Sequence, residues 1–150
     1  MPRFYQASHS ISIAASPERT YEALTDWAER VRWRKGFAIE RDGGSKAFIG
    51  QNVSFKAEGS LIPYAFSYRV TGLEPPRRVY LQYTGPVLKG RGAVEIVPEG
   101  SSCRVSFHWM KVEPGNLTAS VLFGLGWVSR AHERNTRETL RMLKAYLEEV

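Results

Sequence analysis

Cysteine is nearly absent from this sequence of 150 residues, and long hydrophobic runs are absent altogether. The single cysteine, Cys103, excludes an internal disulfide and lies in a strand-like pattern, so we expect it to pack as a small apolar side chain. No apolar run approaches the roughly 20 residues that a membrane-spanning helix needs, and the residues that follow Met1 show no signal-peptide pattern. We therefore expect a cytoplasmic protein.

Motifs that bind metals or nucleic acids are also missing. The three histidines, His9, His108 and His132, have no ligand spacing among them, so we predict no metal and no cofactor. The net charge of +6 raises nucleic acid or an anionic membrane as a partner. The sequence has no zinc-ligand spacing, no RNP-like strand motif and no helix-turn-helix pattern. We predict no nucleic-acid partner, whereas weak contact with an anionic membrane stays open.

Aromatic residues, in contrast, are plentiful, with 4 Trp, 7 Tyr and 7 Phe. Such side chains build the walls of ligand cavities as well as cores. Hydrophobic residues make up 43% of the chain, enough for a substantial core, and no linker or change in composition divides it. We expect one domain that covers residues 1–150.

The predicted elements follow the order strand, two short helices, six strands and a long helix. Residues 5–14 alternate in the manner of a half-buried strand, and Ser16-Pro17-Glu18 is typical of a helix start. A break around Asp26 should separate two short helices that end near Trp33. The six strands are expected at residues 37–41, 52–57, 61–71, 79–84, 92–97 and 102–112. Their connections are short or lack a helical pattern, which predicts an antiparallel meander.

The final helix, expected from Asn116 to Glu149, carries polar groups on its apolar face. Its inward stripe recurs at steps of three and four residues and consists of Leu125, Val128, His132, Thr136, Leu140, Leu143 and Leu147. His132 and Thr136 therefore lie on the face that should be buried. A helix of this kind, laid across an antiparallel sheet, favours a ligand cavity over a dry core.

Two segments resemble the START-like, or SRPBCC, superfamily. They are SPERTYEALTDWAERVRWRKGF at residues 16–37 and HERNTRETLRMLKAYLEE at residues 132–149. The resemblance covers nearly the whole chain and implies an α+β helix-grip fold, in which a curved antiparallel sheet wraps around a long C-terminal helix and leaves an internal cavity. Relatives of this kind include polyketide cyclases or dehydrases, lipid and sterol carriers and quinone-binding proteins, so the fold alone does not select a function.

Strand parity predicts which side chains line the cavity. In residues 61–71, for example, Tyr64, Phe66 and Tyr68 share one face with other apolar residues, while Arg69 takes the other face. The same reasoning places His108 on the outer surface. The predicted ligand-binding residues are Phe55, Tyr64, Phe66, Tyr68, Tyr83, Phe107, Trp109, Leu122, Leu125, His132 and Thr136. A mostly apolar pocket with few polar groups suits an aromatic or lipid-like ligand.

A gate is predicted at one end of the sheet. Residues 85–90 are expected to form a loop whose tip is unusually apolar and whose flanking glycines allow motion. The predicted gate residues are Pro86, Val87, Leu88, Leu117 and Val121. The alternative is a static hydrophobic plug.

The last helix also carries two surface features whose roles stay open. Phe123 and Trp127 form an apolar patch that is a lid, a protein interface or a membrane contact. A basic stripe beside it consists of Arg130, Arg134, Arg137, Arg141 and Lys144. Glutamates are interspersed near this stripe, which also fits a solvated face with local ion pairs.

The function predicted from these patterns is binding of a hydrophobic small molecule for transport, sensing or sequestration. The first alternative is a polyketide cyclase or dehydrase, in which His132, Tyr64 or Tyr68 would move protons. The second is an adaptor that docks to a membrane or a protein. The sequence predicts neither the ligand nor the oligomeric state.

Overall fold

A computed structural model describes residues 5–58, 65–86, 88–114, 116, 121 and 127–149. Tyr64, Val87, Leu117, Leu122, Phe123 and Leu125, for which the sequence predicts roles, lie outside these residues, and the side chain of Trp127 is not described. The elements, in chain order, are β1 (Tyr5–Ile13), α1 (Pro17–Thr25), α2 (Trp27–Trp33), β2 (Phe37–Arg41), β3 (Asn52–Ala57), β4 (Ala65–Glu74), β5 (Arg78–Pro86), β6 (Leu88–Glu99), β7 (Ser102–Pro114) and α4 (Trp127–Glu148).

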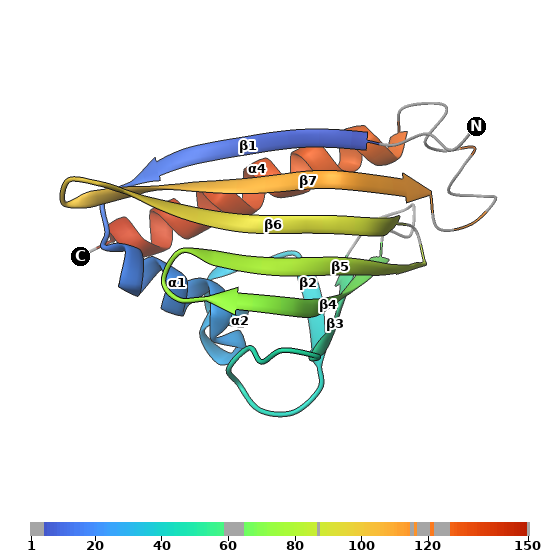
Figure 1. Cartoon of the computed structure of the whole chain (residues 1–150), viewed down its shortest axis with the longest axis horizontal. Helices are drawn as coiled ribbons and strands as arrows, with labels where there is room; N and C mark the ends of the chain where they lie inside the picture. Colours follow the sequence, from blue (N-terminus) through green and yellow to red (C-terminus); the bar gives the residue numbers. More distant parts are fainter. Residues whose placement is uncertain are drawn as a thin grey trace.

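Within the described residues, the seven strands form one antiparallel sheet in the order β1-β7-β6-β5-β4-β3-β2. The sheet is therefore a meander from β2 to β7, and the first strand pairs with the last. It curls, and the helices lie together on one side of it (Figure 1). The long helix α4 packs along β1, while α1 contacts β6. This architecture confirms the predicted α+β helix-grip fold.

Local capping explains the two short helices. The side chain of Ser16 accepts a hydrogen bond from the Arg19 amide at 3.1 Å, which caps α1. Asp26 has an extended backbone, and its carboxylate accepts hydrogen bonds from the amides of Ala28 and Glu29 at the start of α2. Asp26 therefore ends α1 and caps the start of α2, which explains the predicted break.

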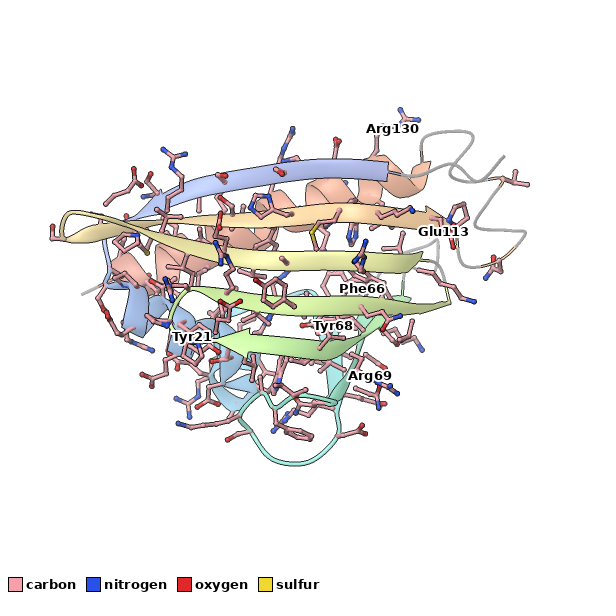
Figure 2. All side chains as sticks on the ribbon, viewed as in Figure 1. Tyr21, Phe66, Tyr68, Arg69, Glu113 and Arg130 are labelled. Carbon is pink, nitrogen blue, oxygen red and sulfur yellow. The ribbon has the colours of Figure 1, made fainter. Side chains whose placement is uncertain are left out.

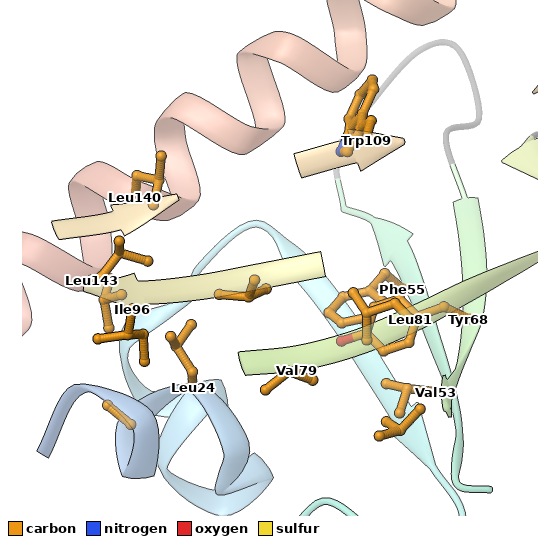
Figure 3. Close-up of a cluster of buried hydrophobic side chains, with 14 of the residues drawn as sticks. Leu24, Val53, Phe55, Tyr68, Val79, Leu81, Ile96, Trp109, Leu140 and Leu143 are labelled. Carbon is orange, nitrogen blue, oxygen red and sulfur yellow. The ribbon is translucent and has the colours of Figure 1, made fainter. Parts of the chain in front are cut away.

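Apolar side chains from the concave face of the sheet and from the helices form the core. Leu24 of α1, Ile96 of β6 and Leu143 of α4 gather at one end (Figure 3). At the other end, Phe55 and Tyr68 pack together beside other residues of β3 to β5 (Figure 3). The alternation of buried and exposed residues in β3 and β4 agrees with the predicted parity.

The expected loop at residues 85–90 is wrong, because β5 continues to Pro86 and β6 begins at Leu88. Leu88 is 0% exposed and lies opposite Pro114 of β7. The nearby glycine has a packing role instead. Gly90 has a φ of 138°, and a Cβ at this position would lie 1.8 Å from the carbonyl oxygen of Lys111. Gly90 therefore permits close strand approach, and Leu88 does not occupy an exposed loop tip.

Candidate functional site

An interior cavity of about 60 Å³ lies between the concave face of the sheet and the helices α2 and α4. A cavity of this size holds a few water molecules. The structure brings together eight of the predicted ligand-binding residues in its wall, namely Phe55, Phe66, Tyr68, Tyr83, Phe107, Trp109, His132 and Thr136. Whether these residues bind a ligand stays a prediction.

The wall of the cavity is mainly aromatic. Phe55 and Phe66 stack with their ring centroids 4.8 Å apart. His132 of α4 enters this group from the opposite side, and its ring centroid lies 5.6 Å from that of Phe66 and 5.7 Å from that of Tyr83. The Trp109 ring is closer still, at 3.2 Å. His132 therefore contacts rings from three strands, and its position is set by packing.

Burial keeps the imidazole of His132 and the phenols of Tyr68 and Tyr83 neutral at physiological pH. It lowers the pKa of His132 well below its usual 6.5, because a charged imidazolium would lose its hydration. Burial likewise raises the pKa of Tyr83 and of Tyr68, although the charge of Arg30 opposes the change at Tyr68. The two phenols can therefore donate hydrogen bonds, and the neutral imidazole can donate from one nitrogen and accept at the other.

Two arginines that are not among the residues predicted from the sequence lie in the cavity wall. Arg30 and Arg34 both line the cavity from the region of α2. Tyr21, Leu24, Trp27 and Val31 follow one another at helical spacing, yet Val31 is 41% exposed. The break at Asp26 resets the phase of the helix, and Trp27, Arg30 and Arg34 then share a face. Restarting the helical count at the Asp26 cap would have found them.

The remaining predicted site residues lie elsewhere. Val121, a predicted gate residue, is exposed, and Pro86 lies at the end of β5. The side chain of His108 lies on the outer face of the sheet, as predicted, where its Nδ1 is 2.7 Å from the Ser8 hydroxyl oxygen and its Nε2 is 3.5 Å from a Glu95 carboxylate oxygen. The residue also borders the cavity. A gate formed by Pro86, Leu88 and Val121 stays a prediction, although Leu88 would have to act from a buried position.

The basic stripe is largely exposed. Arg130 projects outward from the first turns of α4 (Figure 2), and the other arginines of the stripe are exposed as well. Arg134 pairs with Glu138 at 3.3 Å, and Lys144 pairs with Glu148 at 2.6 Å. Ion pairing thus occupies part of the stripe, and membrane contact stays a prediction.

Among the described residues, no group of three His, Cys, Asp or Glu side chains could hold a metal ion. None of the helices described is long and apolar enough to cross a membrane.

Stability should fall in mildly acidic solution because His132 stays neutral in the folded protein. In the unfolded chain the same imidazole titrates near 6.5. Below about pH 6.5 the unfolded state therefore binds more protons than the folded state. The free energy of unfolding should therefore decrease as the pH falls, by up to about 1.4 kcal/mol per pH unit for this one group. Well above pH 6.5 the imidazole is neutral in both states and adds nothing to the slope. Urea denaturation at a series of pH values measures this slope.

The matched variants for this slope are His132→Leu and Thr136→Val. Thr136 lies one turn further along the same buried face, and its hydroxyl donates to the carbonyl oxygen of His132 at 2.9 Å. It does not titrate, so Thr136→Val should keep the acid slope of the wild type. His132→Leu should make the slope shallower. An unchanged slope in His132→Leu would show that this imidazole is not the source.

The curled antiparallel sheet, the C-terminal helix and the aromatic cavity between them place the protein in the helix-grip class. The chain belongs to the family described as polyketide cyclase / dehydrase and lipid transport, whose sequence model matches residues 5–148. This result confirms the predicted SRPBCC superfamily. A search of curated proteins finds no significant match.

Solved structures share the fold at low sequence identity. The di-domain ARO/CYC BexL from the BE-7585A biosynthetic pathway is 19% identical with a TM-score of 0.69, over 94% of this chain and 45% of that one. Norcoclaurine synthase from Thalictrum flavum, in complex with dopamine and hydroxybenzaldehyde, is 12% identical with a TM-score of 0.71, over 99% and 90%. The Aha1 dimer from Colwellia psychrerythraea is 21% identical with a TM-score of 0.63, over 96% of each chain.

Proposed function

We propose that the protein binds a small aromatic or polyketide-like molecule in its interior cavity. The observation that carries this proposal is the ring-lined wall, in which aromatic side chains from β3, β4, β5 and β7 face His132 and Thr136 of α4. Apolar walls with a few fixed polar groups are typical of small-molecule sites. Membership in a family of cyclases and lipid carriers supports the same class of ligand.

Binding requires movement of the wall. A cavity of about 60 Å³ is smaller than a multi-ring ligand needs, so ring side chains must shift when such a ligand enters. The stacked pair of Phe55 and Phe66 and the close pair of Trp109 and His132 occupy the space that would have to open. Ligand entry should therefore be slower than diffusion.

Neutral N-phenylnaphthylamine is a suitable probe because its fluorescence reports transfer into an apolar site. At a concentration one hundred times its dissociation constant, it should stabilise the folded state by about 2.7 kcal/mol. For a chain of this size the melting temperature should rise by about 5 to 10 °C. Fluorescence titration and thermal denaturation measure these two effects.

A Phe66→Trp variant provides the control. Phe66 is buried and contacts Phe55, Tyr83 and His132, so a larger ring there should fill the cavity and weaken binding of the probe. A wild-type protein that neither binds the probe nor shows a thermal shift would contradict the proposed function. Equal binding by Phe66→Trp would place the probe elsewhere.

A second candidate function is that of a polyketide cyclase or dehydrase. It is favoured by His132, Tyr68 and Tyr83, three neutral proton donors or acceptors in one enclosed wall. The name of one structural relative, the di-domain ARO/CYC BexL, points in the same direction. In such an enzyme the imidazole would transfer protons to or from a bound poly-ketone.

A further inference from the structure

Arg34 places a positive charge in the cavity wall and ties α2 to α4. It is 4% exposed. Its Nε donates to the Thr139 hydroxyl at 2.8 Å, and one terminal nitrogen donates to the Asn135 side-chain oxygen at 2.6 Å. The other terminal nitrogen donates a hydrogen bond to the Lys35 carbonyl oxygen and also lies 3.3 Å from the Met142 sulfur. All four partners are uncharged.

Burial lowers the pKa of Arg34 to about 10, so the guanidinium stays charged at neutral pH. The carboxylate of Glu138 opposes this shift from a distance, and the charge of Arg30 adds to it. Glu138 itself pairs with Arg134. Arg34 therefore contributes a charge that its neighbours solvate but do not neutralise.

Arg30 lines the same cavity wall, and at least one of its N–H donors has no hydrogen-bond partner among the described residues. Its guanidinium carbon lies 5.0 Å from the Trp27 ring centroid and 5.5 Å from that of Phe55, so the cation is held between aromatic faces. One terminal nitrogen donates to the carbonyl oxygen of Leu24 at 3.2 Å. The Nε is buried and has no hydrogen-bond partner among the described residues. The guanidinium also makes a side-chain hydrogen bond with Tyr68, and of its five N–H donors the one on the buried Nε is available to a ligand.

Within the described part of the chain, no carboxylate oxygen lies within 4.0 Å of either guanidinium. The nearest buried carboxylate in the sequence of α2 is Glu29, which is bound by Arg19 and by the Tyr146 hydroxyl at 2.9 Å. His132 adds no charge because it is neutral. Arg34 is buried and Arg30 is partly buried, so two cations in one cavity wall without a counterion among the described residues are costly, and cation–π contacts offset only part of that cost.

We propose that the cavity is specific for an aromatic carboxylate, whose acid group is bound by Arg30 in the field of Arg34. This inference rests on the proposed function and adds the charge of its ligand. The planar carboxylate matches the fork of a guanidinium, and the ring system of the same molecule would occupy the space that opens when Phe55 and Phe66 shift. The ligand would supply the counterion that the wall lacks.

The test compares naphthoate with naphthamide, which has the same ring system and shape without the charge. Each is titrated against protein loaded with N-phenylnaphthylamine, and displacement is followed by fluorescence. Naphthoate should bind roughly ten to a hundred times more tightly than naphthamide, the range for a charge-assisted hydrogen bond in a buried site. This comparison uses the wild-type protein and depends on no variant.

Arg30→Met and Arg32→Met are the matched variants. Both remove one positive charge from α2, but Arg32 is exposed and lies outside the cavity wall. Arg30→Met should remove the preference for naphthoate, so that naphthoate and naphthamide bind with equal affinity, and circular dichroism checks that the variant is folded. Arg32→Met should retain the preference. Weak dependence on salt would distinguish the buried site from attraction to the exposed basic stripe.

Equal affinity for naphthoate and naphthamide in the wild type would overturn the proposal, as would a preference that survives in Arg30→Met. Both results leave the proposed function standing if N-phenylnaphthylamine binds. Failure of all three compounds to bind would instead contradict the proposed function itself, and the carboxylate proposal with it.

Discussion

Replacing Trp27 with alanine should lower the free energy of unfolding by about 3 to 5 kcal/mol, the range for removing a large aromatic ring from a core. Trp27 is 2% exposed, and its ring packs edge-on against Phe55, with centroids 6.2 Å apart. Its indole Nε1 donates to the buried side-chain oxygen of Gln51 at 2.8 Å. The variant would lose both contacts and leave the Gln51 oxygen without this donor, which adds to the cost.

Urea denaturation monitored by circular dichroism measures this change. Val31→Ala is the control, because Val31 lies on the same helix and is 41% exposed, so its loss should change the free energy of unfolding by less than about 0.5 kcal/mol. Trp27→Phe should fall between the two, since it keeps part of the ring contact and loses the hydrogen bond. A Trp27→Ala variant as stable as Val31→Ala would show that Trp27 does not anchor α2 to the sheet.

Replacing His132 with leucine should separate binding from catalysis. If the imidazole holds one polar end of a ligand, the variant keeps its fold and loses about 0.5 to 3 kcal/mol of affinity. If the imidazole is a general acid or base, binding stays largely intact and turnover of a poly-ketone slows by about a hundredfold or more. The proposed binding function predicts the loss of affinity, and the candidate cyclase or dehydrase function predicts the loss of turnover.

The decisive measurements are melting temperature, affinity for N-phenylnaphthylamine and turnover, all made on one preparation. Thr136→Val, which changes the neighbouring polar group of the same buried face of α4, shows whether a loss of affinity is specific to the imidazole. A large loss of stability in His132→Leu, with little change in affinity per folded molecule, would assign His132 a structural role. A variant indistinguishable from the wild type in all three would contradict both functional roles for His132.

Most of the fold was predictable because its signals are local. The alternation in β3 and β4, the cap at Ser16 and the break at Asp26 depend on neighbouring residues only. The loop expected at residues 85–90 was wrong for a different reason. Glycines there suggest a loop, but the requirement for Gly90 comes from Lys111 on another strand, which local patterns do not reveal.

The candidate site was predictable in part. Periodicity alone puts His132 and Thr136 on the buried face of α4, and strand parity puts Phe66, Tyr68 and Tyr83 on the concave face of the sheet. The arginines were not foreseen, because arginine is usually exposed and α2 has only 7 residues. In a helix that short, the inward face can be read from spacing only if the helical count restarts at the Asp26 cap.

The amino-acid sequence by itself determined the order of elements, the antiparallel meander and the inward faces of the strands and of α4. These properties follow from backbone geometry and from the period of apolar residues, which act over a few positions. Only the tertiary structure decided that Arg34 meets Asn135 and Thr139 and that Arg30 lies over Trp27 and Phe55. Those contacts join residues up to 105 positions apart, so the charge of the cavity arises from packing between elements rather than from any local pattern.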